Sequence, residues 1–416
     1  MKRFKKLIAI VLTGALCAAA AGCGGSQEPG AASGGGNEIQ DDGRKYVIGV
    51  IPFSDTAVEQ IEWNNYLQQY AGPALNIDFK FVPAPGLDAE AAVTAVEELK
   101  LAGVQGILGI VDTPAAIEKA NELGVWYVRP SGLSTMADYE QVKSLPYYLG
   151  TMGPSLEDEY AAARSATEFF LAGGAKDILV FGALLGLYIP SDMHVQRFEG
   201  IRDALVEAGA VYTPPESNSV VTGPGIGEFA SGASGLNITT IYGLNGYEAL
   251  DATFNDRFTQ AVSGKTFDTV LIGAEGSQDV NTLLNGMGIQ GAKMSEVGAF
   301  TPTTKASFEA GILSFLAGKY PSSLGPGVAA LMNAIDGHAD VVRTADGIGP
   351  RLPAPFWTAT SLEEFNEKAA LDDLANPAFN KALIEQYLVR LHPEVTRESF
   401  AEFAGFGYEE LKARHQ

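Results

Sequence analysis

The 416-residue chain contains little cysteine, little histidine and no excess of positive charge. Its two cysteines are Cys17 and Cys23, and we expect the first to be cleaved off and the second to be modified, which excludes disulfides and thiol catalysis. None of the four histidines stands at a spacing typical of metal ligands, which argues against a zinc enzyme. The formal net charge of −22 argues against nucleic acid and against an electrostatically held membrane surface as partners.

A short basic and apolar segment opens the chain. Four basic side chains in the first six residues precede an apolar run at Leu7–Val11, and Ala20-Ala21-Gly22 leads to Cys23. The run is too short and too rich in small residues for a permanent membrane span. The pattern resembles the lipobox of bacterial lipoproteins, which implies cleavage after residue 22, lipidation of Cys23 and anchoring outside the cell. An ordinary secretory signal with an incidental cysteine is the alternative.

Residues 23–44 contain almost nothing that could pack in a core. We expect a flexible tether with a reach of roughly 25 Å by random-coil scaling, and a folded part that begins near Lys45. The remainder is long enough for two lobes, each with its own core.

From Tyr46 onward, short apolar runs alternate with amphipathic stretches. The runs at 46–51, 77–82, 104–110 and 125–128 predict buried strands, and the stretches between them have helical periodicity. Because strand and helix alternate, we expect a parallel, doubly wound sheet. The same rhythm restarts after Tyr147. The predicted fold class is therefore α/β, with two doubly wound parallel-sheet lobes joined by a hinge.

Two stretches depart from this rhythm. Residues 214–237 are rich in Gly, Pro and Ser and predict a surface excursion with a short strand near Val220. Beyond Arg351 the chain changes character, and 361–416 predicts an appended helical segment that buries one face against a lobe. The expected N-terminal lobe comprises 45–151 and about 319–340, and the expected C-terminal lobe comprises 152–318 and about 341–360.

Four phrases, in order, resemble the type I periplasmic binding proteins, the sugar-binding family that includes ribose-binding protein and shares its core with LacI-type regulators. They are IGVIPFSDT, GVQGILGIVDTPAAIEKANELGVWYV, RFEGIRDAL and EVGAFTPTTKASFEAGILSFLAGKYPSSLG, and the resemblance runs from about Lys45 to His338. It implies a monomer that closes on a small polar solute, with a carbohydrate as the leading candidate, and delivers it to an ABC importer. It implies no cofactor and no metal.

The resemblance also implies where ligand contacts lie, namely after the strands of each lobe. In the N-terminal lobe the expected residues are Phe53, Ser54 and Asp55, then Asp112 and Thr113, then Arg129 and Ser131. An arginine offers a planar fork of donors for vicinal hydroxyls or a carboxylate. The structural alternatives are helix caps for Asp55 and Asp112, and a surface or hinge ion pair for Arg129.

In the C-terminal lobe the expected ligand contacts are Tyr188, Asp192, Arg197, Glu275, Phe300 and Thr301, and two more, Lys319 and Tyr320, are expected at the last hinge crossing. The alternative for Arg197 is a structural pair with a carboxylate. Here the chain departs from the ribose-type pattern, because Ala274-Glu275 replaces an Asn-Asp pair and Ala299-Phe300 replaces an aspartate. This change argues against a simple pentose and leaves a modified sugar, an oligosaccharide end or a stacked nucleoside as alternatives.

Two other functions remain open at this stage. The same fold could report its ligand to a membrane sensor instead of a permease, and the sequence cannot separate the two. An extracellular enzyme is disfavoured, because no G-x-S-x-G, HExxH or Cys/His set is present. The sequence Ser263-Gly264-Lys265-Thr266 echoes the end of a P-loop, but Thr259 occupies the position of its first glycine.

Overall fold

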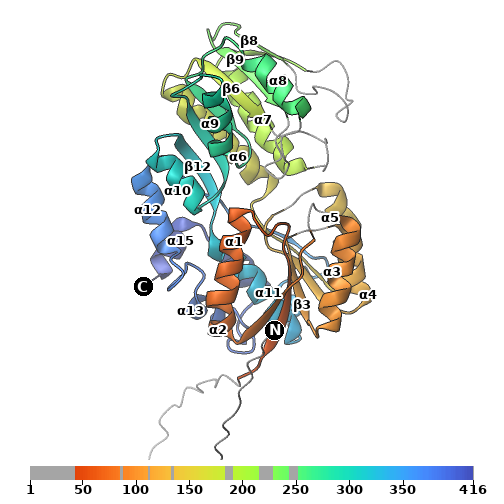
Figure 1. Cartoon of the computed structure of the whole chain (residues 1–416). Coiled ribbons are helices and arrows are strands. Elements are labelled where there is room, and N and C mark those ends of the chain that lie inside the picture. The colour runs from red at the N-terminus through yellow and green to blue at the C-terminus, as the bar shows by residue number, and fades with distance from the viewer. Residues whose placement is uncertain are drawn as a thin grey trace, which may run out of the picture. The chain divides into compact units, whose positions relative to one another are not determined.

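A computed structural model describes residues 43–84, 88–110, 113–132, 135–182, 191–214, 228–242 and 252–415 (Figure 1). The expected signal segment, the lipidated Cys23 and the tether up to residue 42 lie outside these residues, as do Asp112, Tyr188 and the strand expected near Val220. Within the described part, no helix has the length and apolar character needed to cross a membrane.

The first sheet has six parallel strands in the order β13-β5-β4-β3-β1-β2. Its strands are β1 (Tyr46–Ile51), β2 (Ile77–Phe81), β3 (Gly106–Gly109), β4 (Trp126–Arg129), β5 (Tyr148–Gly153) and β13 (Arg351–Pro353). Its helices are α1 (Val58–Asn65), α2 (Gly72–Leu75), α3 (Ala89–Leu101), α4 (Pro114–Glu122), α5 (Met136–Val142) and α11 (Gly325–Ile335), with a π-helical stretch at Tyr66–Ala71. The strand order reverses between β1 and β3, which is where ligands bind in such sheets.

The second sheet repeats this design in the order β14-β12-β11-β10-β6-β9, and only its edge strand β14 runs antiparallel. Its strands are β6 (Asp177–Gly182), β9 (Asn237–Tyr242), β10 (Thr269–Ile272), β11 (Lys293–Ala299), β12 (Leu313–Lys319) and β14 (Trp357–Ala359). Its helices are α6 (Leu156–Ala172), α7 (Asp192–Glu207), α8 (Ala252–Val262), α9 (Ser277–Gly286) and α10 (Pro302–Glu309). A separate antiparallel pair consists of β7 (Val211–Thr213), just before the expected excursion, and β8 (Glu228–Ala230), within it.

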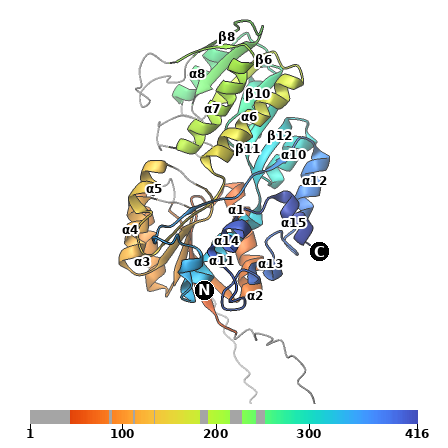
Figure 2. The ribbon, with the colours of Figure 1, turned by 180° about the vertical axis from the view of Figure 1, so that it is seen from behind.

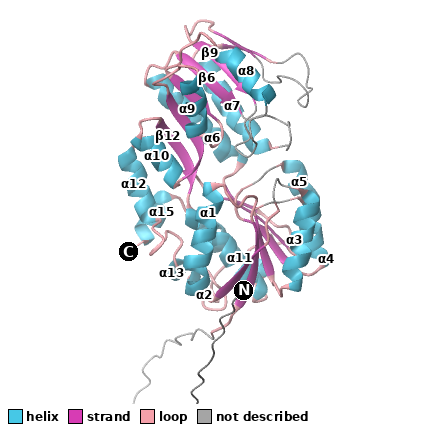
Figure 3. Ribbon diagram, in the orientation of Figure 1, coloured by secondary structure: helices cyan, strands magenta, loops and turns pink. Residues whose placement is uncertain are grey.

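The strands form where the apolar runs predicted them, because parallel strands covered by helices on both faces must be apolar throughout. All four residues of β3 and of β10 are buried. Helix starts follow the capping residues: Ser155 and Asp158 form a capping box at α6, and Thr113 caps α4. Figure 3 shows the resulting alternation of strands and helices in both sheets. The predicted fold class is confirmed.

The C-terminal segment folds into α12 (Leu362–Leu371), α13 (Lys381–Glu385), α14 (Arg397–Ala404) and α15 (Tyr408–Arg414). Helix α12 packs on α10 and β14 of the second sheet, whereas α13 packs on α11 of the first (Figure 2). The largest apolar cluster accordingly contains Tyr46 of the first sheet, Val270 of the second and Phe379 of this segment. The segment therefore shares a continuous core with both lobes.

Some elements differ from the sequence-based expectation. The sequence Thr56-x-x-Glu59 predicts a capping box at the start of the first helix, but this prediction is wrong: α1 begins at Val58, and Glu59 is buried at 2% exposure. The Ser54 hydroxyl instead accepts hydrogen bonds from the backbone N–H groups of Thr56 and Ala57. Residues 341–360, expected in one lobe, supply β13 to the first sheet and β14 to the second.

Candidate functional site

A cluster of ionisable side chains lies at the carboxyl ends of β10, β11 and β12. It includes side chains of α6 and α7 and one side chain of α1, which belongs to the other lobe. We call it the charge cluster and define it as Glu59, Glu159, His194, Arg197, Glu275 and Lys319. Parallel α/β sheets bind ligands outside the carboxyl ends of their strands, so this cluster occupies the expected place for a site.

Lys319 links the two lobes at the end of β12. Its Nζ lies 3.0 Å from Oε1 of Glu59 on α1, and the Glu59 side chain is only 2% exposed. The same ammonium lies 4.9 Å from the centre of the Trp63 ring, in a cation–π contact. Lys319 is thus held by one carboxylate and one aromatic face of the N-terminal lobe.

Glu275 follows β10 and is next to Glu59. The residue is partly buried. Burial, and then the charge of Glu59, raise the pKa of Glu275 well above its ordinary value, and Lys319 offsets only part of this. The ionised form of Glu275 is therefore disfavoured relative to an exposed glutamate.

Arg197 forms the most buried ion pair of the cluster. Its Nε lies 2.6 Å from Oε2 of Glu159, and the two side chains are 5% and 3% exposed. Its Nη1 donates to the carbonyls of Gly273 and Val297, both at 3.2 Å. Burial outweighs the arginine and raises the pKa of Glu159. These contacts are the structural alternative considered for Arg197, and a ligand contact by this residue stays a prediction.

His194 lies in the first turn of α7 and is 6% exposed. Burial, with Arg197 and Lys319 nearby, lowers its pKa to about 3, so the ring is neutral at physiological pH. Its Nδ1 is buried and has no hydrogen-bond partner among the residues that the structure describes. The ring lines a cavity of about 20 Å³, which is bounded by Met193, His194, Arg197, Ala274, Glu275, Val297, Gly298 and Lys319.

The residues of the N-terminal lobe that were expected to contact ligand lie at the strand ends and differ in how deeply they are buried. Phe53 is half-buried, and its N–H donates to Gln60 Oε1 at 3.3 Å. Asp55 is exposed, and the Thr113 hydroxyl accepts from Ala116 N at the start of α4. Arg129 and Ser131, after β4, are buried.

Asp192 connects the lobes at a second point. Its carboxylate accepts a hydrogen bond of 2.7 Å from the backbone N–H of Met136, so the starts of α7 and α5 are joined. The structure therefore brings Arg197, Glu275 and Lys319 together, with Asp192 on the same helix as Arg197.

Three other expected residues lie elsewhere. Phe300 stacks on Phe365 of α12 with ring centres 4.9 Å apart, and Tyr320 stacks on Trp357 at 3.7 Å. Both are buried in the core that the C-terminal segment completes. Thr301 caps α10 in a capping box with Thr304. In this structure their side chains serve packing and capping.

Sequence reasoning did not select Glu59, Glu159 or His194. Glu59 was assigned to a helix cap, and Glu159 stands in a helix with three other acidic residues in its neighbourhood, so nothing distinguished it. A lone histidine carries no spacing signal. Their burial could be foreseen only from the three-dimensional placement of α1, α6 and α7.

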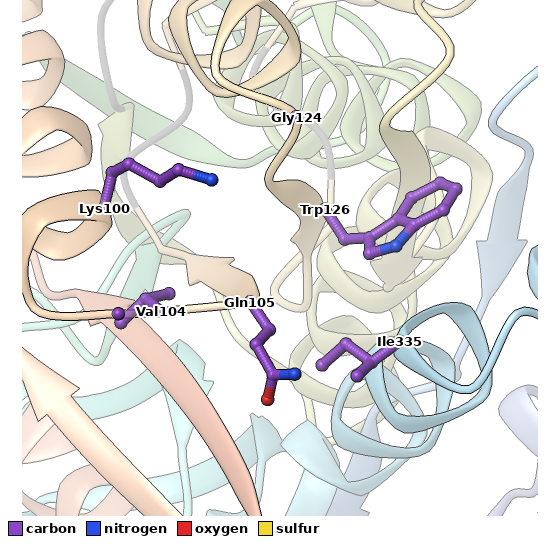
Figure 4. A pocket seen from close by; sticks show the side chains of 7 residues that line it. Lys100, Val104, Gln105, Gly124, Trp126 and Ile335 are labelled. Carbon is purple, nitrogen blue, oxygen red and sulfur yellow. The ribbon is translucent and has the colours of Figure 1, made fainter.

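A larger groove lies at the opposite edge of the first sheet (Figure 4). Its volume is about 340 Å³, and it is lined by Lys100, Gly103, Val104, Gln105, Gly124, Trp126 and Ile335. These residues lie at the amino ends of β3 and β4 and at the end of α11, where doubly wound sheets do not bind ligands. Lys100 and Gln105 are exposed, so the groove presents no buried polar group.

Comparison with known proteins identifies the fold. No protein-family model matches the chain, and no curated protein sequence matches it. Solved structures, in contrast, are similar to this chain. A solute-binding protein of an ABC transporter from Actinobacillus succinogenes, with bound D-allose, is similar with a TM-score of 0.57 at 13% identity, over 78% of this chain and 100% of its own.

Two further structures extend the comparison. An ABC transporter solute-binding protein from Bacillus halodurans, with bound myo-inositol, has a TM-score of 0.53 at 16% identity and covers 80% of this chain and 99% of its own. A fructose-binding periplasmic domain of a hybrid two-component system has a TM-score of 0.55 at 12% identity and covers 79% and 95%. The chain has the fold of the type I periplasmic binding proteins, as predicted.

Proposed function

We propose that this chain is an extracytoplasmic binding protein that captures a small uncharged solute rich in hydroxyl groups, a carbohydrate or polyol, between its two lobes. The observation that carries the proposal is the charge cluster, which lies at strand ends where the two lobes touch. The similar structures support it, because those described above are named for bound allose, bound myo-inositol and fructose binding.

Within this proposal the first lobe contributes Phe53, Ser54, Asp55, Thr113, Arg129 and Ser131, and the second contributes Asp192, Glu275 and Lys319. We assign Phe300, Thr301 and Tyr320 to the core and to capping instead, because of the contacts that they make. A nucleoside stacked on Phe300 is therefore disfavoured, since Phe365 and Trp357 already occupy positions beside its ring.

We propose binding without catalysis. Two of the three acidic groups of the cluster, Glu59 and Glu159, are engaged in pairs with Lys319 and Arg197, and an acid that holds a neighbouring cation serves poorly as a general base. The similar structures are named as binding proteins and a sensor domain. Product formation from a bound sugar would contradict this part of the proposal.

Lipid anchoring at Cys23 and delivery to an ABC importer complete the proposal, and both rest on the sequence pattern and on the similar proteins. A sensor role is the second candidate, because one similar structure belongs to a two-component system. Labelled palmitate should be incorporated by cells that express the chain, and Cys23→Ala should abolish the label. Loss of ligand uptake on deletion of the gene would favour the importer, and unchanged uptake would favour the sensor.

Binding is tested by calorimetry and thermal shift with myo-inositol, D-allose, D-fructose, L-arabinose and adenosine. A ligand that binds only the folded chain raises its stability, by about 2.7 kcal/mol at one hundred times its dissociation constant. We expect at least one polyol or sugar to raise the melting temperature. Absence of any shift at millimolar concentration for every sugar and polyol would refute the proposed function.

A further inference from the structure

The buried ring of His194 has a polar atom that no other described residue pairs with. A neutral imidazole has one donor and one acceptor nitrogen, and nearly all buried polar atoms in proteins have a hydrogen-bond partner. Nδ1 of His194 is an exception, and it belongs to a side chain that lines the small cavity at the carboxyl ends of β10 and β11. Such an atom indicates a missing partner.

The size of the cavity limits what that partner can be. About 20 Å³ accommodates one water molecule, which is also the size of a single hydroxyl group. Met193, Glu275 and Lys319 line the cavity and are only partly buried, so the cavity lies beside the surface. A hydroxyl group could therefore enter it while the rest of a larger molecule stays outside.

The charges around the cavity are already matched. Arg197 is paired with Glu159, and Lys319 is paired with Glu59. Burial and the charge of Glu59 disfavour the ionised form of Glu275, and the His194 ring is neutral at physiological pH. Among the described residues that line the cavity, an anionic guest would meet no cation without a carboxylate partner, and a cationic guest would meet no carboxylate whose ionised form is favoured. A charged guest would lose its hydration without gaining a partner of opposite sign.

We infer that His194 Nδ1 and the Glu275 carboxyl form a subsite that binds one hydroxyl group of an uncharged polyol or sugar and discriminates against amino sugars, sugar acids and sugar phosphates. The inference rests on the proposed function and deepens it by naming the ligand class. Both residues line a cavity that holds one hydroxyl, and an imidazole nitrogen together with a carboxyl group can satisfy the donor and the acceptor of that hydroxyl. His194 is thus a specificity-determining residue of this chain.

The test uses His194→Leu, His194→Gln and, as a matched control, Met193→Leu, which changes another wall of the same cavity without a polar atom. Affinity for the neutral ligand found with wild type is measured by calorimetry. Removing the ring nitrogen should weaken binding tenfold or more, glutamine should restore it to within about threefold, and Met193→Leu should change it less than threefold. In parallel, D-glucosamine, D-glucuronate and glucose 6-phosphate should bind at least tenfold more weakly than the neutral ligand.

A readout without ligand guards against misfolding. Because leucine removes a buried polar atom that lacks a partner, unliganded His194→Leu should be at least as stable to heat as wild type. Wild-type affinity in a folded His194→Leu protein, or a preference for any charged analogue, would overturn the inference and leave the proposed function standing. Failure of wild type to bind any sugar or polyol would instead refute the proposed function.

Discussion

Asp372 at the end of α12 should make this protein more stable in mild acid than at neutral pH. Its carboxylate is 8% exposed and accepts hydrogen bonds from Ser322 N at 3.0 Å, from Ala378 N at 2.9 Å and from the Ser322 hydroxyl. Burial outweighs these donors and raises the pKa of Asp372 from its ordinary 3.8 to about 6. Asp372 therefore joins the C-terminal segment to Ser322, which follows β12. Its ionised form stabilises the folded chain less than its protonated form does.

The sign and size of this change in the free energy of unfolding with pH follow from proton linkage. A carboxyl with a higher pKa in the folded chain than in the unfolded chain contributes stability that is complete below pH 3.8 and is lost as the pH rises through 6. The full contribution is about 3 kcal/mol. Lowering the pH from 7 to 5 should recover about 1.3 kcal/mol of it in the free energy of unfolding.

The assay is urea denaturation of wild type and Asp372→Asn at pH 7 and pH 5. Asparagine does not titrate, so the gain in stability between the two pH values should be smaller in the variant by about 1.3 kcal/mol. Other buried acids titrate equally in both proteins and cancel in this difference. Asp373→Asn, an exposed change of the same type, reports the generic effect. Equal gains in wild type and Asp372→Asn would refute the reasoning.

Two further predictions concern the ion pair and the aromatic core. Arg197→Ala should cost about 3–5 kcal/mol of stability, because Glu159 is left buried without its partner; Arg164→Ala, which breaks an exposed pair with Glu207, should have a much smaller effect in the same denaturation assay. Phe365→Ala should cost about 3–5 kcal/mol, since this 2% exposed ring contacts Phe300 and Phe308. The matched surface change is Leu374→Ala, at 37% exposure, and equal losses for the two would contradict the assignment.

Apolar periodicity was enough to predict the two parallel sheets, because a strand buried on both faces must be apolar along its length. Strands such as β1 (Tyr46–Ile51) and β4 (Trp126–Arg129) accordingly match their predicted ranges within a residue. The three-residue strands β13 and β14 escaped prediction, since their pairing with a sheet edge is a tertiary event with no local signal. Helix α11 was likewise absent from the prediction, although its apolar side chains pack on the first sheet.

The site was harder to predict, because position at a strand end does not decide what covers a side chain. Lys319 and Tyr320 are neighbours in sequence, and both were expected to contact ligand. Lys319 points to Glu59 across the lobes, whereas Tyr320 stacks on Trp357. Adjacent residues of an extended chain face opposite sides, so one residue lies in the charge cluster and the next in the core.

The C-terminal segment accounts for this division. Phe365 of α12 covers Phe300, and Phe379, whose ring centre is 6.4 Å from that of Tyr320, closes the same core beside the crossing between lobes. Side chains at the strand ends that face the C-terminal segment thus pack in the core. Those that face α1 and α7 lie in the charge cluster. Since the family resemblance ends before this segment, it predicts ligand contacts at the ends of all these strands and cannot distinguish the ends that the segment covers. The position of the site in this chain is therefore decided partly by residues for which the resemblance offers no counterpart.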